Sequence, residues 1–143
     1  MKLRHIALAL ACILLLSACS KEEEAFMPSA EISLDDDSLS VADKSISTEF
    51  VTATIGRQDK VDQETMFTVK FQNKEAVYAV DSAGIKLTEL STKPLRGKNA
   101  MDVLQFKVFG TKGEAEEAKY SLGLELMWGN KTLQSEQVTV SVE

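Results

Sequence analysis

Residues 118–128, which read AKYSLGLELMW, decide the fold class because their side chains alternate between apolar and polar types. Successive side chains of a β-strand point to opposite faces, so an alternation of period two predicts a strand with one buried face. The apolar positions are Ala118, Tyr120, Leu122, Leu124, Leu126 and Trp128. Gly129-Asn130 follows and predicts a tight hairpin into another strand over 132–142.

The same alternation continues outward from this stretch, and helical periodicity is absent beyond the first 18 residues. It predicts about seven strands, at roughly 46–55, 65–73, 76–80, 85–90, 102–109, 117–128 and 132–142. Seven short antiparallel strands in about 105 residues are typical of an all-β, immunoglobulin-like β-sandwich. A small lipid-binding β-barrel is the alternative fold, because alternation alone does not separate a barrel from a sandwich.

One local pattern supports the sandwich. Glu116-x-Ala118-x-Tyr120-x-Leu122 resembles the F-strand pattern Asp-x-Ala-x-Tyr-x-Cys of the immunoglobulin superfamily, with leucine at the cysteine position. The resemblance implies that residues 104–108 form strand E and that Gly129-Asn130 forms the F–G turn. It also implies that Tyr120 is a tyrosine corner, whose hydroxyl bonds to backbone upstream. The chain departs from the family in lacking the cysteine pair and in placing Trp128 outside strand C.

The first 18 residues have the form of a secretory signal peptide, with Lys2 and Arg4 before an apolar run over 6–16. The run is short for a permanent membrane-spanning helix. Leu16-Ser17-Ala18-Cys19 matches the lipobox Leu-[Ala/Ser]-[Gly/Ala]-Cys at all four positions, so this end resembles bacterial lipoprotein precursors. The resemblance implies cleavage between Ala18 and Cys19 and lipidation of Cys19. An ordinary signal peptide in which Cys19 is incidental is the alternative.

An acidic segment follows the lipobox. Residues 20–37 hold seven acidic side chains and one lysine, a composition that predicts an extended, disordered tether over 19–37 before a domain at 38–143.

Lys21-Glu22-Glu23-Glu24 in this segment resembles the lipoprotein export signal of Bacteroidota, which implies exposure on the cell surface. A generic charged spacer is the alternative, and Ser20 also resembles outer-membrane sorting in enteric bacteria. A Gram-positive outer-leaflet lipoprotein fits too. All of these readings place the domain outside the cytoplasm, with the outer membrane or cell surface favoured.

The few reactive side chains exclude several classes of function. His5 and Cys12 leave with the signal peptide and Cys19 carries lipid, so the mature domain has no imidazole and no free thiol. Ser-His-Asp triads, Cys-His pairs and His-ligated zinc sites are then excluded. The run 35–38 (Asp-Asp-Asp-Ser) lacks the alternate spacing and the glycine of a calcium loop. We expect no enzymatic activity, no metal and no cofactor other than the covalent lipid.

One compact basic feature is a candidate partner-binding loop. Residues 91–99 carry Lys93, Arg96 and Lys98 on a stretch with proline and glycine, and such a loop could meet an acidic partner. Aromatic side chains are not interleaved with these cations, so nucleic acid is not expected as a partner. A solvated connector is the alternative interpretation.

We therefore expect a lipid-anchored, non-catalytic interaction module that contacts an envelope protein or a surface polymer. The alternative is a carrier of a lipid or another small apolar ligand. The two hypotheses differ in the interior, because the module predicts a filled core and the carrier predicts a cavity of several hundred Å³ among the same side chains. Those side chains are Phe67, Phe71, Phe106, Tyr120, Leu122, Leu124 and Trp128.

Overall fold

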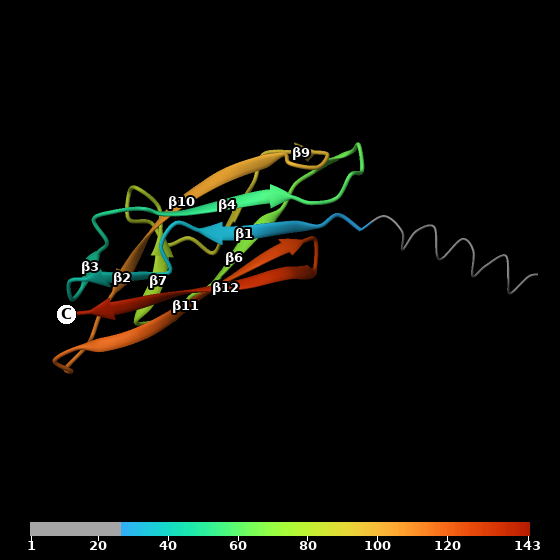
Figure 1. Cartoon of the computed structure of the whole chain (residues 1–143). Coiled ribbons are helices and arrows are strands. Elements are labelled where there is room, and N and C mark those ends of the chain that lie inside the picture. Colours follow the sequence, from blue (N-terminus) through green and yellow to red (C-terminus); the bar gives the residue numbers. More distant parts are fainter. Residues whose placement is uncertain (1–26) are drawn as a thin grey trace, which may run out of the picture.

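A computed structural model describes residues 27–143, which form an all-β sandwich of two facing sheets (Figure 1). The predicted immunoglobulin-like fold class is confirmed. The predicted signal peptide (1–18), Cys19 and residues 21–24 lie outside the described residues. In residues 27–143 no helix is present that is long and apolar enough to cross a membrane.

The first sheet is organised around β10 (Met101–Gly110). β4 (Val51–Arg57) pairs with the first part of β10, and β1 (Ala30–Leu34) pairs with β4. β3 (Ser45–Ile46) and β7 (Val77–Val80) both pair with the last part of β10. The predicted strand at 46–55 is therefore two strands, since residues 47–50 lie opposite only two residues of β10 and form a bulge.

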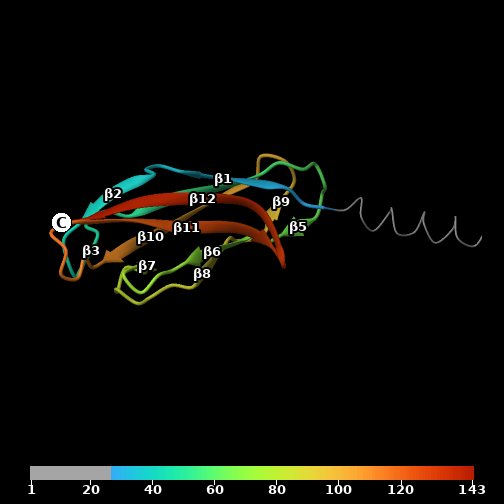
Figure 2. The same cartoon turned by 90° about the horizontal axis from the view of Figure 1, so that it is seen from below.

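The second sheet has the order β2-β12-β11-β6-β8, and Figure 2 shows it stacked against the first. Its strands are β2 (Ser38–Val41), β6 (Thr68–Gln72), β8 (Glu89–Ser91), β11 (Ala118–Trp128) and β12 (Lys131–Val142). β5 (Glu64–Thr65) and β9 (Leu95–Arg96) form a separate two-stranded sheet. All pairs are antiparallel except β2 with β12, so the predicted fully antiparallel sandwich is wrong at this edge.

The core lies between the two sheets and is filled largely as the alternation predicts. Phe67, Phe106, Leu122 and Leu124 are 0% exposed, and Phe71 is also buried. The Phe71 and Phe106 rings meet edge to face, with centroids 4.8 Å apart. Tyr120 and Trp128 are partly buried and pack against the margin of this cluster. These contacts join β6, β10 and β11 across the sandwich.

Two local features implied by the immunoglobulin resemblance are present. The hydroxyl of Tyr120 donates to the carbonyl oxygen of Thr111 at 3.0 Å, as expected of a tyrosine corner. Gly129 adopts a φ of 57° in the turn between β11 and β12, which confirms the tight hairpin. Both features fix β11 relative to its neighbours in the chain.

The predicted tether boundary at residue 37 is wrong. Residues 30–34 form β1, which pairs with β4 throughout, and Ala30 and Ile32 are buried in the core. The side-chain amide of Gln134 completes the outer edge of β1, because it accepts from the Ile32 N–H and donates to the Ile32 carbonyl oxygen, both at 3.1 Å. The sandwich therefore begins near residue 29, and the acidic residues 35–37 form the crossover from β1 to β2.

A buried ion pair secures the end of β4. Arg57 is 0% exposed, and its Nε and Nη2 each donate to the Asp59 carboxylate at 3.0 Å. Its Nη1 donates to the carbonyl oxygens of Gln63 and Leu95, which belong to the segments around β5 and β9. Asp59 also accepts from the backbone N–H of Ser29. One buried cluster thus ties the start of the sandwich to the small β5–β9 sheet.

Candidate functional site

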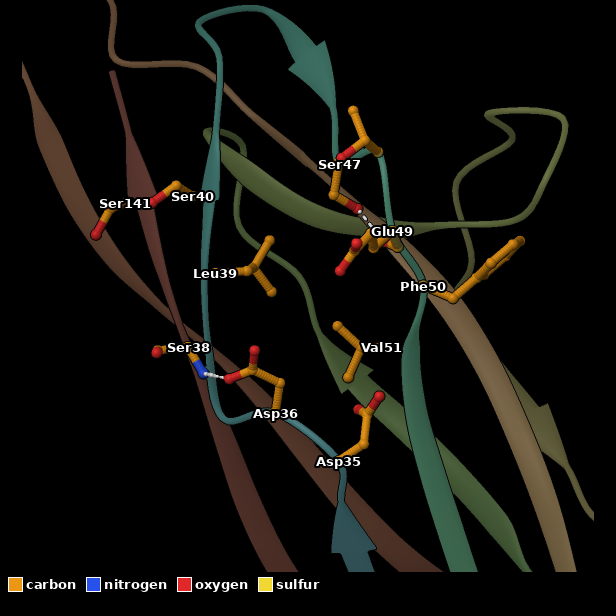
Figure 3. A pocket seen from close by; sticks show the side chains of 11 residues that line it. Asp35, Asp36, Ser38, Leu39, Ser40, Ser47, Glu49, Phe50, Val51 and Ser141 are labelled. Atoms are coloured by element: carbon orange, nitrogen blue, oxygen red, sulfur yellow. Dashed lines mark hydrogen bonds between the residues drawn. The ribbon is translucent and has the colours of Figure 1, made fainter.

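One concavity of the surface is a groove along the free edge of β2, which we call the β2 groove. It has a volume of about 400 Å³ and lies between β2 and the bulge that precedes β4 (Figure 3). Its walls carry mostly carboxylates and hydroxyls, with a few apolar side chains: Asp35, Asp36, Ser38, Leu39, Ser40, Ser47, Thr48, Glu49, Phe50, Val51 and Ser141. β2 has β12 on one side only, so its other edge faces this groove.

Two carboxylates of the groove accept hydrogen bonds from backbone N–H groups. Asp35 accepts from the backbone N–H of Thr52 at 2.8 Å, and Asp36 accepts from that of Ser38 at 3.0 Å. Figure 3 shows Asp36 and Glu49 on opposite walls, both reaching into the groove. Among residues 27–143, no group of three or more acidic, histidine or cysteine side chains is placed to hold a metal ion.

One hydroxyl of the groove, that of Ser47, has structural partners as well. Ser47 Oγ donates to the carbonyl oxygen of Glu49 and accepts from the backbone N–H of Val108, each at 3.0 Å. These bonds hold the bulge against β10. Ser47 Oγ thus donates to a backbone carbonyl oxygen, and not to a side-chain base of the kind that activates a serine nucleophile. The arrangement offers hydrogen bonds and negative charge to a polar or cationic group.

Two neighbouring cavities extend the same surface. One of about 450 Å³ shares Asp35 and Asp36 with the β2 groove, and one of about 440 Å³ shares Ser40 and Ser141. The core aromatic side chains line none of these three cavities. The carrier hypothesis predicts a cavity lined by Phe67, Phe71 and Phe106, and none of these three cavities is that one.

The candidate partner-binding loop at residues 91–99 is anchored by buried side chains, and its charged side chains are exposed. Thr92 and Leu95 are buried, while Lys93, Arg96 and Lys98 are exposed. The Lys93 backbone N–H donates to Asp102, and the Arg96 guanidinium lies 3.7 Å from the carboxylate of exposed Asp62. The three cations share one surface loop, but Arg96 has an acidic neighbour within the chain.

Two carboxylates have lowered pKa values, and neither lines the β2 groove. Hydrogen bonds from the backbone N–H of Lys112 and the hydroxyl of Thr111 lower the pKa of Asp43, against a smaller effect of desolvation. Desolvation raises the pKa of Asp59, but hydrogen bonds from Arg57 and from backbone N–H groups outweigh it and lower the pKa overall. Both groups stabilise the fold as carboxylates.

Sequence reasoning missed an apolar surface on the outside of the first sheet. Ile46, Phe50, Ile85, Met101 and Val103 are between 38% and 65% exposed. The signal was present in β10, where apolar residues occupy both parities of the alternation rather than one. A strand of this kind has no uniformly polar face.

Comparison with known proteins gives structural similarity alone. No protein-family model matches the chain, and no curated protein matches it. The CARDB domain of a Pyrococcus furiosus protein, in complex with di-metal ions, has a TM-score of 0.46 at 15% identity over 81% of this chain and 92% of that one. Domains 4 and 5 of the S-layer protein SbsC have a TM-score of 0.40 at 19% identity over 81% and 53%. The periplasmic chaperone SfaE has a TM-score of 0.43 at 10% identity over 79% and 56%.

Proposed function

We propose that this chain is a lipid-anchored, extracytoplasmic lipoprotein whose sandwich acts as a non-catalytic interaction module. The single observation that carries the proposal is the complete lipobox at residues 16–19, which ends an apolar run of the length that signal peptides use. Two or three acyl chains on Cys19 would hold the protein durably at a membrane, whereas one chain binds only marginally.

The domain boundary determines how far such an anchor holds the sandwich from the bilayer. Ten residues, 20–29, separate Cys19 from the start of β1. A fully extended chain spans at most about 3.3–3.6 Å per residue, so the start of β1 would lie within about 40 Å of the lipidated residue. The end of the sandwich at which β1 begins would therefore lie close to the membrane surface.

The surfaces of the sandwich are suited to binding rather than to chemistry. Ser47, Asp35 and Asp36 of the β2 groove bond to backbone groups, and the loop with Lys93, Arg96 and Lys98 presents exposed positive charge. Edges and loops of a rigid sandwich are common contact sites for extended segments and folded partners. An envelope protein or a surface polymer is the kind of partner that we propose.

The anchor is tested by replacing its acceptor. Cells that produce the wild-type chain or Cys19→Ala are labelled with radioactive palmitate and fractionated. We expect label and membrane retention in the wild type, with loss of label and accumulation of the uncleaved form in Cys19→Ala. Equal processing and equal membrane retention of both chains would overturn the proposed anchor.

The side of the membrane is tested separately by protease treatment of intact cells. A wild-type chain with a C-terminal tag is compared with a variant in which Lys21 and Glu22 to Glu24 are replaced by alanine. Loss of the tag in the wild type and protection in the variant would support surface export through residues 21–24. Protection of both chains in a Gram-negative cell would place the domain in the periplasm.

A further inference from the structure

The two sheets of the sandwich present chemically different outer faces. In the second sheet, every outer position of β6 and of the C-terminal half of β12 holds a polar side chain, namely Thr68, Lys70, Gln72, Gln137, Thr139 and Ser141. Such a face is typical of an antiparallel sheet whose other side covers the core. Solvent alone therefore accounts for the composition of this face.

The first sheet departs from that pattern along β10. Phe109 lies on its outer face, directly opposite Ile46 of β3 and Tyr78 of β7. Phe50 from the bulge extends the same area, because Lys107 of the outer face lies over its ring. Ile85 belongs to the loop after β7, between Gly84, which approaches Ile46, and Lys86, which lies over Tyr78. We call Ile46, Phe50, Tyr78, Ile85 and Phe109 the aromatic patch. Ile46 is 39% exposed, Phe50 is 38% exposed and Ile85 is 65% exposed.

The geometry of the aromatic patch is that of a preformed surface. The rings of Tyr78 and Phe109 stack with centroids 4.8 Å apart and an interplanar angle of 23°. Figure 3 shows the Phe50 ring extending away from β2, and Phe50 also lines the β2 groove, so the groove and the aromatic patch meet at this residue of the bulge. Aromatic and large aliphatic side chains held in place are typical of the energetic centre of a protein interface.

The charge around the aromatic patch is positive, although the described domain as a whole is acidic. Lys86 Nζ lies 4.8 Å from the centroid of the Tyr78 ring, and Lys107 Nζ lies 4.9 Å from that of Phe50. The neighbouring acid, Asp81, already accepts from the backbone N–H groups of Ala83 and Ile85 at 2.9 Å. Lys86 and Lys107 outnumber this carboxylate around the patch, so the local net charge is positive.

The position and charge of the aromatic patch distinguish three possible occupants, namely a lipid surface, a second copy of this chain and a different protein. In both Figure 1 and Figure 2, β3 and β7 lie at the end of the sandwich opposite the start of β1, which is the strand nearest in sequence to Cys19. With the proposed anchor at Cys19, the lipid would be attached through the end of the sandwich that does not carry the patch. A second copy of this chain would bring the same two lysines of each copy toward one another, which is unfavourable.

We infer that the aromatic patch is the docking surface for a different protein, whose contact surface combines apolar side chains with carboxylates that pair with Lys86 and Lys107. This inference rests on the proposed interaction role and adds the surface and the chemistry of the partner. Carboxylates of the partner set the orientation through the two lysines. Apolar side chains of the partner cover the exposed Ile85 and Ile46.

The test is site-specific photo-cross-linking in the cell that produces the full chain. p-Benzoyl-phenylalanine replaces Ile85 in one chain and Met127, on the outer face of the second sheet, in a control chain. A third chain carries the photoreactive residue at position 85 together with Lys86→Glu and Lys107→Glu. Its melting temperature is compared with that of the first chain, because both lysines are on the surface and their reversal should leave the fold intact. Adducts are identified by mass spectrometry.

We expect a discrete adduct with another protein from position 85 and none from position 127. Charge reversal should lower its yield at least about tenfold, and reversing the contacting acids of the identified partner should restore it. An adduct with a second copy of this chain, an adduct with lipid, an adduct insensitive to charge reversal, or no adduct from position 85 would each overturn the inference. Palmitate labelling of the same chains reports separately on the anchor, so failure of the docking surface and failure of the proposed anchor are distinguished.

Discussion

Replacing Asp59 by alanine removes the carboxylate that faces a fully buried guanidinium. In the wild type, Arg57 makes two 3.0 Å bonds to Asp59 and two further bonds to the carbonyl oxygens of Gln63 and Leu95. Asp59→Ala removes the first two and leaves a charge that is 0% exposed without its counter-ion. Breaking a buried ion pair by deleting one member typically costs about 3–5 kcal/mol.

The cost expected for Asp59→Ala is near the lower end of that range, at about 3 kcal/mol, because Nη1 of Arg57 keeps its two carbonyl acceptors. A domain of this size has a free energy of unfolding of about 5–15 kcal/mol, so the loss is a large fraction of the total. With a urea dependence of about 2 kcal/mol per molar, the midpoint of unfolding should fall by about 1.5 M.

Urea unfolding followed by tryptophan fluorescence measures this change, since Trp128 packs at the margin of the core. The matched control is Asp62→Ala, because Asp62 pairs with Arg96 at 3.7 Å where both side chains are more than half exposed. An exposed pair contributes less than about 1 kcal/mol.

Arg57→Met combined with Asp59→Ala should be destabilised by less than the sum of the two single variants, because no unpaired charge then remains. Equal costs for Asp59→Ala and Asp62→Ala, or strict additivity in the double variant, would refute the reasoning.

Three further outcomes follow from single contacts. Because the pKa of Asp59 is lowered from its ordinary value of 3.8, its carboxylate stabilises the fold above that pH and the contribution disappears as the pH falls through the lowered value. Unfolding free energy of the wild type should therefore fall more steeply below about pH 4 than that of Asp59→Asn, as measured by urea titrations at several pH values. Tyr120→Phe removes the bond to Thr111 and should cost about 1 kcal/mol in the same assay. Gln134→Ala leaves the backbone groups of Ile32 without their side-chain partners, so it should cost about 1–3 kcal/mol and speed amide hydrogen exchange at position 32.

The alternation of period two predicts the long strands because each has one face in the core. β11 and β12 lie close to their predicted ranges, and the central aromatic side chains are buried as expected. The alternation did not predict β1, because its sequence AEISL lies between carboxylates on both sides and the charge of the whole segment is typical of a disordered tether. The period of two is present in this segment, where Ala30, Ile32 and Leu34 alternate with Glu31 and Ser33. The net negative charge of residues 20–37 outweighed it in the prediction.

The buried charge and the parallel edge could not have been read from the sequence. Arginine is mostly exposed in proteins, and nothing local to Arg57 reveals that the carbonyl oxygen of Leu95, 38 residues away, will accept from it. The pairing of β2 with β12 depends on the crossover at 35–37, where Asp35 and Asp36 bond to nearby backbone N–H groups and turn the chain from one sheet to the other. Such turns are set by contacts that form only after both sheets exist.

Alternation alone does not predict the composition of the outer face of the first sheet. Period two sorts the residues of β10 into two sets, and burial of Phe106 and Val108 identifies the inner one. Alternation then predicts polar, solvated side chains in the other set. That set instead contains Phe109, which stacks on Tyr78, and Met101, which is 55% exposed. A strand with apolar residues in both sets needs a second cover in addition to the core. In residues 27–143 the core covers only one of the two faces of β10, so the composition of this strand is explained if a partner covers the other.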